Sequence, residues 1–258
     1  RVVAPALAQR FGTSEDTIRR DLRELAAAGL CQRVYGGALP RSPASGSLIE
    51  RQEVAPERKR ALGESMAGSI LLAGQVVFVD AGSTNLATVR ALPPTGPALT
   101  LITNAPGVAA EAALRDYVEL IVIGGRFDRQ TGSALGAKTM NDIAGLRPDV
   151  YLLGVSALDV EAGIGEFGFE ETELKRMLVC QSGRVLCAAT TDKLGTRAPF
   201  SVAPLSVLSE LLLEADAPTE HVEALRRGGV PVYVGSDRVQ AAQTLLADHP
   251  ECNVIVSD

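Results

Sequence analysis

The stretch that decides the fold is Gln75-Val-Val-Phe-Val-Asp80, followed directly by Ala81-Gly-Ser-Thr84. A run of consecutive apolar residues predicts a strand that is buried on both faces of a parallel sheet. Further apolar runs lie at 99–103, 118–123, 150–154, 184–189 and 231–234, and helical patterns lie at 84–91, 106–114, 170–182 and 219–227. Strands that alternate with helices in this way predict an α/β domain with a parallel sheet.

Small and polar residues follow three of these predicted strands. They are Asp80 with Gly82, Ser83 and Thr84, then Thr103 with Asn104, then Gly124 with Gly125. Ligands of open parallel sheets bind at the carboxyl ends of the strands. A helix N-terminus with two hydroxyls suits an anion, and a carboxylate beside it suits a sugar hydroxyl. These features fit a sugar phosphate, although many Gly-Ser-Thr turns are purely structural.

The composition excludes several protein classes. The chain has 258 residues, of which 46% are hydrophobic, so it can bury a sizeable core. No apolar stretch approaches the roughly 18 residues that span a bilayer, and the N-terminus has no secretory apolar region. Four scattered cysteines without a C-x-x-C pair suit a reducing cytoplasm. With only two histidines, we expect no metal site and no cofactor.

Charge is unevenly distributed along the chain. Residues 1–41 contain seven arginines and four acidic residues, whereas the rest contains 18 basic and 27 acidic residues. A basic head on an acidic body predicts that the head contacts a polyanion. Ordinary solvated surfaces can differ in net charge by this much, so charge alone does not show that the head binds a polyanion.

The head has the pattern of a helix-turn-helix. Residues 6–11 form a short helical pattern, Gly12 provides a turn, and Thr13 or Ser14 can cap a second helix that ends at Gly29. Ile18, Leu22 and Leu25 would form its buried stripe. Residues 31–38 predict a short hairpin wing. We therefore divide the chain into a winged helix-turn-helix domain at 1–38, a Pro/Ser/Gly-rich linker at 39–54 and an α/β domain at 55–258.

Polar side chains of the head suit contacts with DNA. Ser14 and Thr17 would lie near bases or phosphates at the start of the second helix. Arg19, Arg20 and Arg23 on this helix are candidates for contacts with phosphates or guanine edges. On the wing, Arg33 and Tyr35 are candidates for contacts with the DNA backbone. A helical hairpin with a solvated arginine face would give the same bare pattern.

The exact residues are more specific than the pattern. Residues 8–25 (AQRFGTSEDTIRRDLREL) and 29–38 (GLCQRVYGGA) strongly resemble the N-terminal domain of DeoR-family transcriptional regulators. Two departures stand out. The wing usually has His at the position of Tyr35, and the family places a further helix before residue 6, so we expect the first helix of the domain to be missing from this chain.

The body resembles the DeoR-family sensor domain along nearly its full length. The matching stretches are Arg51 with Lys59, 79–84, 103–104, 123–127, 153–156, Glu171 with 175–176, and 193–195. The resemblance implies a fold similar to ribose-5-phosphate isomerase and a phosphorylated sugar as effector. It implies that Gly82, Ser83 and Thr84 bind the phosphate, with Asp80, Asn104, Gly125 and Lys193 around the rest. The family usually has Asp where this chain has Thr190, and the loss of that carboxylate argues against isomerisation.

These expectations favour a cytoplasmic repressor of sugar-catabolism genes that is not an enzyme. Its partners would be operator DNA, a phosphorylated sugar and further copies of itself, because readers of the major groove usually act as dimers. One alternative is an enzyme similar to sugar-phosphate isomerases with an accessory DNA-binding head. Another is a binding module that has lost contact with DNA. The acidic residues Glu170, Glu171 and Glu173, which open a predicted helix, are expected to be structural.

Overall fold

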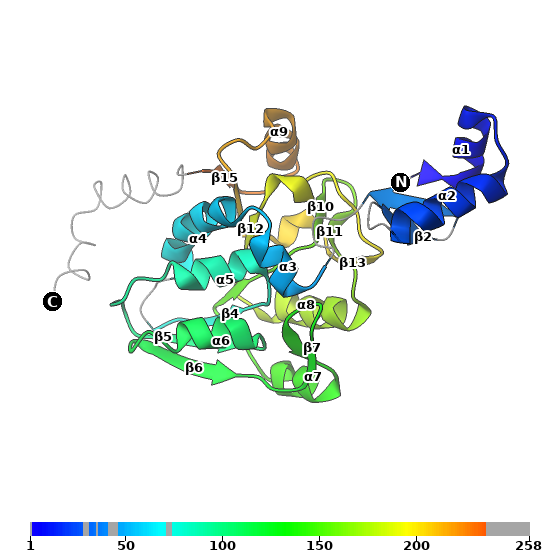
Figure 1. Cartoon of the computed structure of the whole chain (residues 1–258). Coiled ribbons are helices and arrows are strands. Elements are labelled where there is room, and N and C mark those ends of the chain that lie inside the picture. The colour runs from blue at the N-terminus through cyan, green and yellow to red at the C-terminus, as the bar shows by residue number, and fades with distance from the viewer. Residues whose placement is uncertain (1, 28–30, 35, 41–45, 71–73, 236–258) are drawn as a thin grey trace. The chain divides into compact units, whose positions relative to one another are not determined.

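The computed structural model describes residues 2–27, 31–34, 36–40, 46–70 and 74–235 (Figure 1). The chain forms two compact units, Arg1–Ser45 and Gly46–Asp258. The stretch predicted as a linker, 39–54, contains the last two residues of one strand and the whole of helix α3 (Leu48–Glu53). No helix among the described residues is long and apolar enough to cross a membrane.

The first unit is a helix-turn-helix with a wing. Helices α1 (Ala4–Phe11) and α2 (Glu15–Ala27) are joined by a turn in which Gly12 has φ 62°, a left-handed conformation that glycine adopts without strain. Strands β1 (Val2–Val3), β2 (Cys31–Val34) and β3 (Gly37–Pro40) pair antiparallel in the order β1-β3-β2. The predicted helices and hairpin are confirmed. The predicted end of α2 at Gly29 lies outside the described residues.

The core of this unit is small, and one predicted core residue does not belong to it. Its buried side chains are Ala4, Ala8, Ile18, Leu22 and Ala38. Leu25 was expected on the same stripe, but it is 41% exposed. Among the described residues, α1 contributes two buried alanines to this core and α2 contributes Ile18 and Leu22.

The second unit is built on a parallel sheet of seven strands. Its order is β15-β14-β12-β9-β4-β5-β6, and every pairing is parallel. The strands are β4 (Val76–Val79), β5 (Leu99–Thr103), β6 (Val118–Val122), β9 (Val150–Leu152), β12 (Arg184–Ala189), β14 (Glu210–Leu213) and β15 (Val232–Val234). The six predicted strands are confirmed, and β14 is an addition. Smaller antiparallel sheets are formed by β7 (Arg126–Asp128) with β8 (Ser133–Leu135), and by β10 (Ala157–Asp159), β11 (Gly163–Glu166) and β13 (Phe200–Ala203).

Helices cover both faces of the large sheet, which is why its strands are apolar throughout. On one face lie α4 (Pro56–Ile70), α5 (Ser83–Arg90) and α6 (Pro106–Ala112), which pack against side chains such as Val77 and Val79 (Figure 1). On the other lie α7 (Ala137–Ala144), α8 (Phe169–Gln181) and α9 (Thr219–Arg227), which pack against side chains such as Phe78. The predicted mixed α/β class with a parallel sheet is therefore confirmed.

The strand order reverses direction between β4 and β9. From β4 the chain builds outward through β5 to β6, and it then returns to place β9 on the other side of β4. The side-chain amide of Asn85 donates to the carbonyl oxygens of Asp80 (3.1 Å) and Leu152 (3.0 Å), so it joins the ends of both strands. In open α/β sheets such a switch point is where ligands bind.

Candidate DNA interface and effector site

The two hydroxyls at the start of α2 are bonded to one another. Ser14 Oγ accepts a hydrogen bond from the backbone N–H of Thr17 at 3.1 Å and lies 2.9 Å from Thr17 Oγ1. Ser14, rather than Thr13, therefore caps the helix. Both side chains lie at the end of the helix that a helix-turn-helix presents to the major groove.

The arginines of α2 differ in their ion pairs. Arg19 lies 2.8 Å from Glu15 and 3.5 Å from Asp16, and Arg20 lies 3.8 Å from Asp21. Arg23 is exposed and has no ion pair within the part of the chain that the structure describes. Surface pairs of this kind contribute about 0–1 kcal/mol, so DNA phosphates can replace the carboxylates. The side chain of Arg33 and the whole of Tyr35 lie outside the described residues.

Helix α5 begins at the switch point without a side-chain cap. Gly82 stands at its N-cap with φ 154°, and within the described part of the chain no side-chain cap hydrogen bond is found at its first turn. By contrast, α3 has a complete capping box formed by Ser47 and Glu50. The first backbone N–H groups of an uncapped helix attract an anion. Ser83 is partly exposed here and Thr84 is buried.

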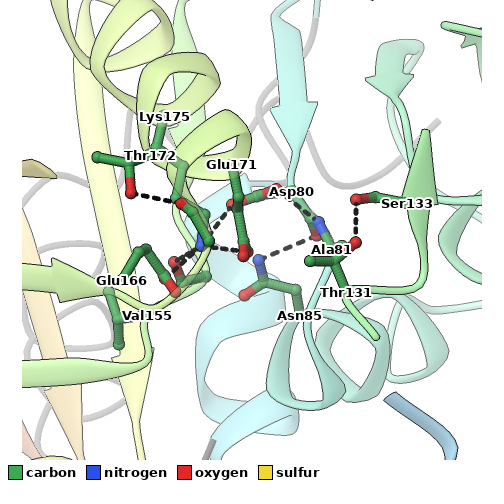
Figure 2. Close-up of polar contacts among 12 residues, drawn as sticks. Asp80, Ala81, Asn85, Thr131, Ser133, Val155, Glu166, Glu171, Thr172 and Lys175 are labelled. Carbon is green, nitrogen blue, oxygen red and sulfur yellow. Dashed lines mark hydrogen bonds and ion pairs between the residues drawn. The ribbon is translucent and has the colours of Figure 1, made fainter. Parts of the chain in front are cut away.

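Next to this helix start lies a buried lysine cluster, which we define as Asp80, Tyr151, Glu166, Glu171 and Lys175. Figure 2 labels four of its members, Asp80, Glu166, Glu171 and Lys175. Lys175 Nζ contacts Glu166 Oε1, lies 2.9 Å from Glu171 Oε1 and 3.5 Å from Asp80 Oδ2, and donates to the Gly154 carbonyl at 2.8 Å. The Tyr151 hydroxyl donates to Asp80 Oδ2 at 3.0 Å. One cation thus holds three carboxylates beside the switch point.

Burial dominates the titration of the carboxyl groups Glu166 and Asp80, and the carboxylates dominate that of Lys175. Desolvation raises the pKa of Glu166 to about 7, Glu171 adds to the rise, and the Lys175 ammonium opposes it. Desolvation also raises the pKa of Asp80. The pKa of Lys175 is raised, because its three carboxylates together outweigh its own desolvation. Lys175 therefore stays charged at neutral pH.

Asp80 is less accessible than a residue that reads a sugar hydroxyl would need to be. It is 2% exposed, Oδ1 accepts from the backbone N–H of Ala81 at 2.8 Å, and Oδ2 faces Tyr151 and Lys175. Its predicted contact with the effector stays a prediction, and its observed role is to bind the lysine.

The residues after β5 and β6 have mixed roles. Thr103 is buried, and its hydroxyl donates to the Val79 carbonyl at 2.7 Å. Asn104 donates to the Ala134 carbonyl at 2.9 Å, but its buried Oδ1 has no hydrogen-bond partner among the described residues. Gly124 is exposed. A Cβ on Gly125 would lie 2.0 Å from Thr139 Oγ1, so close packing alone requires glycine there.

Lys193 lies in the short 3₁₀ turn Thr191–Lys193 that follows β12. Its Nζ donates to the Val155 carbonyl at 2.8 Å, and the residue as a whole is partly exposed. Desolvation of its ammonium group lowers its pKa to about 8, while Asp192 opposes the shift. Thr190, where the family usually has a carboxylate, is buried at the end of β12.

Sequence reasoning missed most of the buried lysine cluster. The spacing of Glu171 and Lys175, four residues apart on one helix, was the available signal. Glu166 and Tyr151 carried none, because their proximity depends on how β11 and β9 are placed. The acidic residues that open α8 do form ion pairs: Glu170 with Arg126, Glu171 with Lys175 and Glu173 with Arg176.

Comparisons with known proteins agree with this architecture. Residues 54–214 match the DeoR C-terminal sensor domain and residues 3–43 match the DeoR-like helix-turn-helix domain. The HTH-type transcriptional regulator GlpR of Haloferax volcanii is 34% identical over 90% of this chain and 91% of its own length. The glycerol-3-phosphate regulon repressor of Escherichia coli is 30% identical over 85% of this chain and 86% of its own.

A solved structure of ribose 5-phosphate isomerase A from Neisseria gonorrhoeae gives a distant likeness. Its TM-score is 0.37 at 15% identity, over 54% of this chain and 53% of that chain. The fold assignment therefore rests on the strand order described above. The curated relatives named above are regulators and repressors rather than enzymes, which agrees with the prediction of a non-enzymatic protein. The chain belongs to the DeoR family of transcriptional regulators.

Proposed function

We propose that this chain is a repressor that binds operator DNA through its first unit and a phosphorylated metabolite through its second. The observation that carries the proposal is the match of both units to the two domains of one regulator family. Relatives at 30% identity are glycerol-3-phosphate regulon repressors, so glycerol 3-phosphate is the first effector to test. Sugar phosphates come next, because the resemblance described in the sequence analysis implies a phosphorylated sugar as effector.

The effector phosphate binds at the start of α5 in this proposal. The uncapped N-terminus at Gly82, Ser83 and Thr84 offers backbone N–H groups and hydroxyls, and Lys193 adds a positive charge. The hydroxyl end of the effector faces Asn104, whose buried Oδ1 needs a donor. Gly124 and Gly125 lie at the neighbouring strand end.

The first unit reads DNA with the start of α2. Ser14 and Thr17 lie at the end that enters the groove, and Arg19, Arg20 and Arg23 contact phosphates. The proposal includes Arg33 and Tyr35 as wing contacts on the basis of the resemblance alone. A homo-oligomer in the cytoplasm, with two reading units on paired half-sites, completes it.

DNA binding is tested with the full chain and its own upstream region. We expect a preference over random DNA of at least 1,000-fold, with affinity that falls steeply with salt. Equal affinity for both DNAs at every salt concentration would contradict the proposal.

Effector binding is tested by thermal unfolding with glycerol 3-phosphate, ribose 5-phosphate and a hexose 6-phosphate, each paired with its unphosphorylated parent. A ligand at about 100 times its Kd stabilises the folded chain by roughly 2.7 kcal/mol. We expect one phosphorylated compound to stabilise the chain and its parent not to. Stabilisation by parent and phosphate alike would contradict a phosphate site. Turnover of ribose 5-phosphate would instead support the isomerase alternative, which none of the named relatives favours.

A further inference from the structure

Strand β6 forms one edge of the large sheet, and its outer side is open. Within the described part of the chain it pairs with β5 alone. The carbonyl oxygen of Tyr117 accepts from β5 at 3.1 Å and the N–H of Ile123 donates to β5 at 2.8 Å, so the odd-numbered residues of β6 bond inward. Backbone groups alternate between the two sides of a strand, so those of Leu120 and Val122 point away from the sheet. This edge therefore presents unpaired donors and acceptors.

The side chains along this edge are apolar and exposed. Ile121 is 40% exposed and Val122 is 51% exposed, and the two point to opposite faces because they are consecutive in a strand. Leu114, just before β6, and Phe127, just after it, are exposed as well. The three residues of β15, at the other edge of the sheet, are instead buried or half-buried. An exposed apolar edge is a template for pairing with another strand.

The five residues of β6 include none of the features with which proteins usually protect an edge. The strand has no lysine and no proline, and its pairing with β5 runs without a bulge. Its one charged residue is Glu119, whose carboxylate is held by β5 because it accepts from the Thr100 hydroxyl at 3.1 Å. The edge is therefore open to a partner strand.

We propose that β6 pairs antiparallel with β6 of a second copy of this chain, so that the two large sheets become continuous. A two-fold axis at Leu120 pairs all five residues of each strand. Leu120 then exchanges N–H and carbonyl bonds with Leu120 of the second copy, and the Val122 N–H bonds to the Val118 carbonyl. This register sets Glu119 opposite Ile121, so the two carboxylates do not meet. A register centred on Glu119 would set like charges opposite one another, which destabilises a strand pair.

A second copy is the partner that the chemistry of this edge favours. The strand is complementary to itself in hydrogen bonding, in apolar character and in charge, as an interface with two-fold symmetry requires. The inference gives an interface to the homo-oligomer of the proposed function. It is tested without DNA and without effector, so its failure and the failure of DNA or effector binding are separate results.

The test uses two variants of the full chain, Val122→Pro and Val122→Lys. The Val122 N–H points away from β5, so proline removes a donor to the second copy and no bond within the sheet. Lysine places on the edge the charge that protects edges in other proteins. Val160→Lys is the matched control, because Val160 is 46% exposed in the turn between β10 and β11. Sedimentation over a range of concentrations measures self-association, and hydrogen exchange of the unmodified chain gives a readout that needs no variant.

We expect the unmodified chain to self-associate and both Val122 variants to weaken the association by at least tenfold, with unchanged circular dichroism. Val160→Lys should match the unmodified chain within threefold. In the associated chain the amides of Leu120 and Val122 should be protected as well as those of Glu119 and Ile121, and dilution to the monomer should speed their exchange at least tenfold.

Three results would each overturn the inference: a monomeric unmodified chain, undiminished association of both Val122 variants, or unprotected Leu120 and Val122 amides in the associated chain. A monomer that still binds its upstream DNA and glycerol 3-phosphate would overturn the inference and leave those two parts of the proposed function standing.

Discussion

Replacing Lys175 with methionine removes the only cation in the buried lysine cluster. The ammonium lies 3.5 Å from Asp80 and 2.9 Å from Glu171, and it contacts Glu166. Breaking a buried ion pair by removing one partner costs about 3–5 kcal/mol, because a charge stays buried without compensation. For a domain of this size each kcal/mol lowers Tm by about 2–4 °C. We therefore expect Tm to fall by about 6–20 °C.

The stability lost on Lys175→Met should be larger at high pH than at low pH. The pKa of Glu166 is about 7 in the folded chain, above its ordinary value of 4.5. Between these values the folded state binds more protons than the unfolded state, so stability falls as pH rises. The Lys175 ammonium opposes the raised pKa of Glu166 and of Asp80, so without it the pKa of each of these two groups rises further. The cost of Lys175→Met should thus be largest above pH 7 and smaller at pH 5, where more carboxyl groups are protonated.

The assay is urea unfolding of Lys175→Met, of Lys138→Met and of the unmodified chain at pH 5 and pH 7.5. The exposed Lys138–Asp142 pair should contribute less than about 1 kcal/mol at either pH. Adding Glu166→Gln to Lys175→Met should restore part of the loss, because one buried charge is then removed. A cost below 1 kcal/mol for Lys175→Met, or a cost that grows at pH 5, would refute this reasoning.

Three further predictions follow from the site and its packing. Arg23→Ala should weaken binding to operator and to random DNA equally and reduce the slope of log affinity against log salt by about 1, whereas a loss confined to operator DNA would indicate a base contact. Binding of glycerol 3-phosphate should weaken from pH 7 to pH 9 as Lys193, with a pKa of about 8, loses its proton; calorimetry of Lys193→Met should show weaker binding and a smaller change with pH. Gly154→Ala should lower stability in urea by about 1–3 kcal/mol, because its Cβ would lie 2.4 Å from the Ala81 carbonyl oxygen, while Gly145→Ala, with no neighbour within 4 Å, should stay within about 0.5 kcal/mol.

The strands of the large sheet could be predicted because each is buried on both faces and therefore uniformly apolar. The small antiparallel strands of the second unit could not be predicted from the sequence. Strand β11 (Gly163–Glu166) has four residues, two of them glycines, and it lacks both alternation and a continuous apolar run. Leu25 shows the opposite error, since its spacing fits a buried stripe but its side chain is 41% exposed.

The residues of the candidate site also fall into those that the sequence predicts and those that it does not. Asp80, Ser83 and Thr84 are adjacent in sequence, so one turn places them together without knowledge of the fold. Glu166 reaches Lys175 only because β11 lies against α8, and Lys59 reaches Arg51 and Val54 only because the chain turns between α3 and α4. Contacts of that kind depend on tertiary placement, which local patterns do not specify.

The reversal of strand order at β4 and β9 also divides the sheet into two sequential blocks. Strands β4, β5 and β6 come from residues 76–122, and β9, β12, β14 and β15 from residues 150–234. The two blocks meet at the three residue pairs between β4 and β9, at the amide of Asn85 and at the contacts of Asp80 with Tyr151 and Lys175. A ligand at this edge of the sheet would contact both blocks at once, so its binding would stabilise the junction between β4 and β9. Effector should therefore slow hydrogen exchange most at the β4–β9 junction and leave the outer strands β6 and β15 nearly unchanged.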